Sequence, residues 1–117
     1  MKEIKVLKFN PKEKVKEEQI ENTLEGIQKA VGGYFESIPI DNKFILICNE
    51  EGKIKNLENN VCLVRLKEIK ILDTIKGSCF ITKRRGENFS SLSKEDLKEL
   101  KKRIDFDEDS KLSVLFV

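Results

Sequence analysis

Five short apolar runs constrain the fold of this chain more than any other feature of its sequence. Each spans six residues and is bounded by polar or turn-forming residues: 4–9, 43–48, 61–66, 77–82 and 112–117. The runs are rich in β-branched and aromatic side chains, and they are too short for buried helices. They therefore predict strands, and the polar stretch "NEEGKIKNLENN" between the second and third runs predicts either a plain connection or a face that meets a ligand.

Three further segments are less clear-cut. Residues 34–40 are expected to pair with 43–48 in a tight hairpin about Asp41-Asn42, because both turn residues tolerate positive φ. Pro39 lacks an amide donor, which places its strand at a sheet edge or at a bulge. Residues 14–21 are polar and would form an edge strand at best, and residues 68–75 are left open.

Capping residues mark the ends of two predicted helices. Asn22 is expected to cap the first helix, with Glu25 at the capping-box position and the Gly32-Gly33 pair at its end. The second helix is expected to start at Ser93 with Asp96 as the reciprocal partner, and its buried stripe is predicted to be Leu97, Leu100 and Ile104. The prediction is an α+β fold: a single compact domain over residues 1–117, with a mostly antiparallel sheet and two helices.

The amino-acid composition limits the kinds of catalysis and binding that the chain can carry out. The chain has 23 basic and 21 acidic residues and a net charge of +2, so nothing in bulk favours nucleic acid. Histidine is absent, which excludes serine–histidine and cysteine–histidine catalysis and every histidine metal site. The three cysteines fall in apolar runs and are expected to be reduced and buried, as in a cytoplasmic protein. No apolar stretch is long enough to span a membrane, and no cofactor motif is present.

The acidic segment "DFDEDS" has the alternate carboxylates of a calcium loop at Asp105, Asp107 and Asp109. However, Ser110 stands where that loop needs glycine and Phe116 where it needs glutamate, so a solvated turn between helix and strand is expected and no metal site is predicted. A carboxylate enzyme, such as a metal-dependent phosphodiesterase, would need acidic side chains to converge in space. It stays an alternative, as does a nucleic-acid-binding regulator.

Two groups of residues are candidates for binding. Lys83, Arg84 and Arg85 precede a glycine and could hold a phosphate, although a charged hairpin turn has the same composition. If they capture a nucleotide, replacing both arginines by alanine should abolish capture.

The second group lies at one predicted sheet edge, where pairing of the hairpin strands would gather Tyr34, Glu36, Asn49 and Glu50. The alternative is structural: a turn at Glu51-Gly52, with the Asn49 amide satisfying nearby backbone groups.

Three segments carry a resemblance: "LEGIQKAVGGYFESIPI", "FILICNEEGKIKNLENN" and "IKGSCFIT". Together they resemble an uncharacterised small domain family of Gram-positive bacteria, their phages and plasmids, over roughly residues 1 to 95. Asn60 matches the family's asparagine, whereas Asn56, Glu58 and Val61 depart from its usual glycine, proline and arginine.

The resemblance implies a non-enzymatic accessory protein of a mobile element. Such a protein would counter host defence by binding a defence protein or by sequestering a nucleotide signal. Its contact surface would be the group around Tyr34, Asn49, Glu50 and Asn60, or else the Lys83–Arg85 group. A sequestering protein is expected to be a homo-oligomer.

Overall fold

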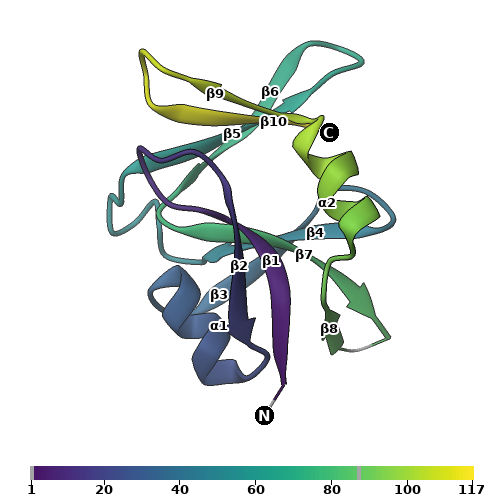
Figure 1. The fold of residues 1–117 in the computed structure, drawn as a ribbon. Coiled ribbons are helices and arrows are strands. Elements are labelled where there is room, and N and C mark those ends of the chain that lie inside the picture. The colour runs from purple at the N-terminus through teal and green to yellow at the C-terminus, as the bar shows by residue number, and fades with distance from the viewer. Residues whose placement is uncertain (1, 87) are drawn as a thin grey trace.

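The computed structural model describes residues 2–86 and 88–117. Within them the chain forms ten strands and two helices (Figure 1). In chain order these are β1 (Glu3–Phe9), β2 (Lys16–Glu21), α1 (Leu24–Val31), β3 (Phe35–Pro39), β4 (Phe44–Asn49), β5 (Asn59–Arg65), β6 (Lys70–Lys76), β7 (Cys79–Arg85), β8 (Asn88–Ser90), α2 (Lys94–Lys101), β9 (Ile104–Asp107) and β10 (Leu112–Phe116).

The strands divide between two sheets. A six-stranded sheet has the order β2-β1-β7-β4-β3, with β8 beside β7, and a four-stranded sheet has the order β6-β5-β10-β9. Every pair is antiparallel except β5 and β10, which run parallel. The predicted α+β class with two helices is confirmed. Residues 68–75, left open by their sequence, supply most of β6, an edge strand of the smaller sheet.

The hairpin of β3 and β4 forms, but its turn differs from the one predicted. Asp41 and Asn42 are not among the residues with positive φ; instead, Asp41 Oδ1 accepts the amides of Lys43 and Phe44, each at 2.8 Å. A side-chain acceptor closes this turn, so no left-handed residue is needed. The expected edge positions are confirmed, because β2 and the Pro39-containing β3 lie at the two edges of their sheet.

Helix α1 is capped one residue later than predicted. The Thr23 hydroxyl accepts the amide of Gly26 at 3.0 Å, whereas the Asn22 side chain donates to Phe89 O at 3.1 Å. The strand pairing holds Asn22 back at the end of β2, where its backbone amide donates to Lys2 O. The predicted C-terminus is confirmed, since Gly32 adopts φ 79° and its amide donates to Gln28 O.

Helix α2 begins as predicted and ends early. Ser93 and Asp96 form the reciprocal capping box. The helix ends at Lys101, and Ile104 begins β9, where it lies opposite Leu115 of β10. The prediction that Ile104 completes the helical stripe is therefore wrong. Asp105 and Asp107 likewise belong to β9 and not to a turn, because pairing with β10 outweighs continuation of the helix.

Two core clusters define the layers. One lies between the sheets and α2, with Phe9, Phe44, Leu63, Leu100 and Leu115 among its members. The other lies between α1 and the opposite face of the larger sheet. All three cysteines are free; Cys48 and Cys79 are buried as expected, whereas Cys62 is only half-buried. In the described part of the chain, neither helix has the length and apolar character needed to cross a membrane.

Candidate functional site

The segments "VGGY" and "NEEGK" meet at Asn49. Its Nδ2 donates to Val31 O at 3.2 Å, and its Oδ1 accepts the amide of Glu51 at 2.8 Å. A Cβ on Gly33 would lie 3.1 Å from Asn49 Nδ2, so the glycine lets the α1 end approach this close. Asn49 is 5% exposed. It therefore joins the end of α1 to the turn after β4, and this turn is the one predicted at Glu51-Gly52.

Asn60 has a similar role between the sheets. Its Nδ2 donates to Phe9 O at 2.9 Å and to Gly77 O at 2.7 Å, and the residue is 1% exposed. The amide thus connects β5 of the smaller sheet to β1 and to the start of β7 in the larger one. A buried carbonyl without such a donor is costly, so the side chain acts as a tie inside the protein.

An open cleft of about 460 Å³ lies beside the Asn49 junction. Its polar lining is Lys8, Lys29, Asn49, Lys55, Glu58 and Ser78, and its apolar lining includes Val31 and Leu57. The volume is in the range of small-molecule sites. We call this the basic cleft, because three lysines face a single carboxylate.

The three lysines of the basic cleft differ in their ion-pair partners. Lys8 is 8% exposed and lies 3.4 Å from Glu18, and Lys55 lies 3.4 Å from Glu51. Lys29 makes no ion pair with any described residue. The C-terminal end of α1 also faces the cleft and carries roughly half a negative charge. Because Asn49 and Gly32 already satisfy carbonyls there, the lysines dominate and the cleft favours an anion.

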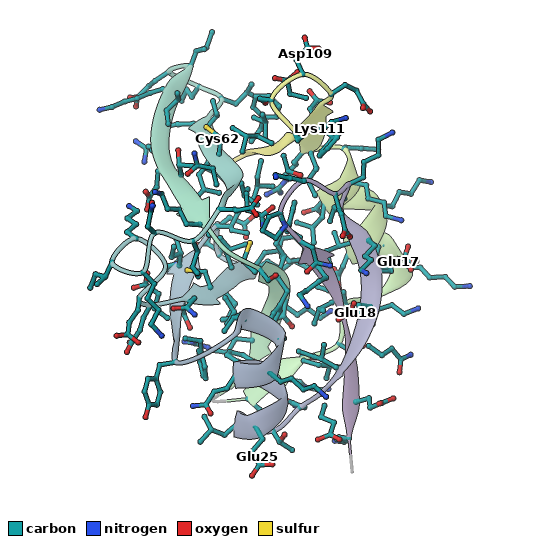
Figure 2. All side chains as sticks on the ribbon, turned by 90° about the vertical axis from the view of Figure 1, so that its left-hand side faces the viewer. Glu17, Glu18, Glu25, Cys62, Asp109 and Lys111 are labelled. Carbon is teal, nitrogen blue, oxygen red and sulfur yellow. The ribbon has the colours of Figure 1, made fainter. Side chains whose placement is uncertain are left out.

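A second hollow of about 560 Å³ adjoins the basic cleft and shares Lys8, Lys29 and Ala30 with it. It lies between α1 and β2 and is acidic, with Glu3, Glu18, Glu21 and Glu25 in its lining. Figure 2 shows Glu18 on β2 and Glu25 at the lower end of α1. Among residues 2–86 and 88–117, no three acidic or thiol side chains are placed to hold a metal ion.

The predicted edge group is brought together, but only part of it is accessible. The amide of Glu50 donates to Tyr34 O, which confirms that Tyr34 lies across from the Asn49 region. Tyr34 is 66% exposed, and Glu36 and Glu50 are also exposed. Glu36 lies opposite Cys48. Burial, followed by the charge of Glu36, raises the pKa of Cys48 to about 12, so this thiol is no nucleophile at neutral pH.

The predicted basic group lies at the end of a strand, β7, where β7 pairs with β8 in a hairpin. The last three residues of β7 are Lys83, Arg84 and Arg85. The Lys83 ammonium lies 2.5 Å from a carboxylate oxygen of Asp96. Neighbouring strand residues point to opposite faces, so Arg84 and Arg85 cannot grip one phosphate together. Arg84 also lies six residues beyond Ser78, about 20 Å from the basic cleft along the strand.

The lysines of the basic cleft were not predicted. They come from β1, α1 and the turn after β4, among 23 basic residues spread over the chain. Lys8 is the one of them that lies within an apolar run, between Leu7 and Phe9, but Lys5 interrupts the same run between Ile4 and Val6.

A family model described as Domain of unknown function (DUF3846) matches residues 4–105. The match includes α1, β3, β4 and the turn that follows, and so covers both segments that meet at Asn49. Neither a curated protein nor a solved structure matches the chain. Any function must therefore be argued from the geometry of the site.

Proposed function

The chain belongs to the family of the Domain of unknown function (DUF3846), and from that premise we propose that it is a small binding protein that captures a phosphate-bearing ligand, such as a nucleotide. The observation that carries the proposal is the basic cleft, in which Lys8, Lys29 and Lys55 line about 460 Å³ beside the Asn49 junction. Lysine ammonium groups bind phosphate as point charges, and the cleft is large enough for a nucleotide.

Capture without chemistry is favoured over catalysis by the kinds of side chain present. The cleft offers cations, an amide and a hydroxyl, and Glu58 is the only carboxylate among the described residues that line it. Carboxylate acid–base catalysis uses a pair of acidic groups, and the described lining of the cleft does not hold such a pair. Cys48 and Cys79 are buried, and burial raises the pKa of both thiols.

The proposal also includes a biological role for the protein. The resemblance to a family of phages and plasmids supports an accessory protein that acts in the cytoplasm against host defence. A protein that holds a nucleotide in a basic cleft would act there by sequestering the signal of a defence system. The mobile-element setting supports this biological role, and the basic cleft supplies the chemistry.

The test is ligand capture by the purified protein. Compounds released by heating should include a phosphate-bearing species by mass spectrometry, and a panel of mono-, di- and cyclic nucleotides should contain a stabilising member. At 100 times its Kd, a ligand stabilises the fold by about 2.7 kcal/mol. The corresponding rise in Tm is about 10 °C.

The matched variants are two double substitutions. Lys29→Ala with Lys55→Ala should weaken binding by at least about 30-fold, because two charged hydrogen bonds are lost. Lys98→Ala with Lys102→Ala removes the same charge from exposed positions on or next to α2 and should leave binding unchanged. Failure of every nucleotide to raise Tm, together with no released phosphate compound, would end the proposal.

Capture of a host protein is a second candidate, and one observation favours it. Strand β3 is an open sheet edge, with the exposed Tyr34 at its start and Glu36 and Glu50 beside it. Such an edge can accept an extended segment of a partner as an added strand. Tyr34→Ala should abolish pull-down of the partner and leave nucleotide binding intact, whereas the cleft variants should do the reverse.

A further inference from the structure

The two central strands of the four-stranded sheet, β5 and β10, are apolar on both faces, whereas Asp105 and Asp107 of the edge strand β9 lie beside them on the outer face. Inward-facing Val61, Leu63 and Leu115 are buried, as expected for a core. The residues that alternate with them point outward and are half-buried: Cys62, Val64, Leu112, Val114 and Phe116. Val114 lies opposite Cys62, and Phe116 opposite Val64, so they form one continuous surface. An antiparallel sheet with one face in water normally carries polar residues on that face.

Nothing in the described chain covers this outer face. Helix α1 lies on the larger sheet, and α2 packs into the core between the sheets (Figure 1). Val64, Val114 and Phe116 belong to neither core cluster, nor to the partly buried residues that pack on them. The apolar surface continues onto the β5–β6 turn, where Leu66 is 63% and Ile69 84% exposed. Apolar patches of this kind mark interaction sites.

The charges around the outer face are arranged in two corners. Because β5 and β10 are parallel and β6 and β9 are the edges, the β5–β6 and β9–β10 turns lie at diagonally opposite corners. Residues 65–70 carry three cations and one anion, and we call them the basic corner. Residues 105–111 carry four anions and one cation and form the acidic corner, where Figure 2 labels Asp109 and Lys111.

We propose that the outer face binds the same face of a second copy of this chain, so that the basic corner of each copy lies on the acidic corner of the other. A two-fold axis within the interface, along the remaining diagonal, exchanges the two corners. It also crosses the strands of the two sheets near a right angle, which is one of the two usual ways that sheets pack. The dimer does not use the basic cleft, because none of the residues that line the cleft belongs to the outer face.

The size of the face sets the expected strength. Four strands about 4.8 Å apart and about five residues long cover roughly 320 Å². A standard stable interface buries about 800 Å² per partner, so the exposed turn residues must contribute and the dimer is weak. We expect a Kd on the order of 10 µM.

The first experiment is sedimentation of the full chain from about 1 to 300 µM, across the expected Kd. Val114→Lys places a charge at the centre of the face and should raise Kd at least about 30-fold. Ile54→Lys, at a position 84% exposed in the turn between β4 and β5 and outside the strands of this sheet, should leave Kd unchanged. Circular dichroism confirms that each variant folds. Cys62 should be alkylated more slowly as the wild-type chain associates, since the dimer covers it.

The second experiment tests the corners by charge exchange and does not depend on the Val114 variant. Asp105→Lys with Asp109→Lys makes both corners basic, and Lys67→Glu with Lys70→Glu makes both acidic. Each variant alone should stay monomeric at about 100 µM, tenfold above the expected Kd. A mixture of the two should form a heterodimer. A wild-type chain that stays monomeric at every concentration, or dimers that tolerate Val114→Lys, would overturn the proposal and assign this face to a different protein.

Discussion

Asp96 makes the clearest prediction for stability, because one buried carboxylate connects three parts of the fold. It is 1% exposed, and its Oδ2 accepts the amide of Ser93 at 2.8 Å at the start of α2. The same carboxylate lies 2.5 Å from Lys83 Nζ on β7 and 2.8 Å from Lys43 Nζ in the β3–β4 turn. Its removal therefore loosens α2 from the larger sheet.

The magnitude of Asp96→Ala follows from these contacts. Loss of the capping interaction costs about 1 kcal/mol. The lost hydrogen bond to Lys83, whose side chain is 25% exposed, adds about 2 kcal/mol. Lys43 is 51% exposed and contributes little. We expect unfolding to become easier by about 3 kcal/mol, with a Tm about 12 °C lower.

The pH dependence gives an independent check with Asp96→Asn. Burial alone would raise the pKa of Asp96, but the hydrogen bonds from Lys43, Lys83 and Ser93 outweigh it and hold the pKa well below its ordinary value. A carboxylate with a lowered folded-state pKa stabilises the fold above its unfolded-state pKa and loses that effect as pH falls. The gap between wild type and Asp96→Asn should be constant above about pH 5 and shrink below about pH 4.

The assay is urea unfolding at pH 7, followed by thermal unfolding from pH 7 to about pH 2. Glu95→Ala is the matched control, because it removes an exposed acid from the same helical turn. If Asp96→Ala unfolds within about 0.5 kcal/mol of that control, or if the gap to Asp96→Asn widens as pH falls, the reasoning is wrong.

Three further predictions concern single side chains. Asn60→Ala should destabilise the fold by about 1–3 kcal/mol in urea unfolding, since it removes the two hydrogen bonds that the buried Asn60 amide donates, whereas the exposed Asn59→Ala should change little. Ser113 Oγ is buried without a partner among the described residues, so Ser113→Ala should be neutral or stabilising by about 1 kcal/mol; a larger loss would show that the hydroxyl is paired. In dilute protein, iodoacetamide should label Cys62 first by peptide mass spectrometry, because burial raises the pKa of the other two thiols; equal labelling would contradict this.

The elements of the fold could be predicted wherever the signal is local. The Ser93–Asp96 capping box spans three residues, and Gly32 ends α1 through its own positive φ. The apolar runs could be predicted as strands because the side-chain pattern of a strand lies within each run. Errors arose where a distant contact competed with a local one. Ile104 left the helical stripe to pair with β10, and Thr23 replaced Asn22 as a cap because Asn22 is held at the end of β2.

By itself the sequence determined the fold class, most strands, both helices and the lack of histidine chemistry. Only the tertiary structure decided that the strands form two sheets, that Asn49 and Asn60 are interior ties, and that three lysines share a cleft. Asn60 and Phe9 are 51 residues apart, and neither segment carries a sequence signal that predicts its contact with the other. Backbone preferences and side-chain periodicity determine the local structure, whereas a site depends on which surfaces meet when the whole chain buries its apolar residues.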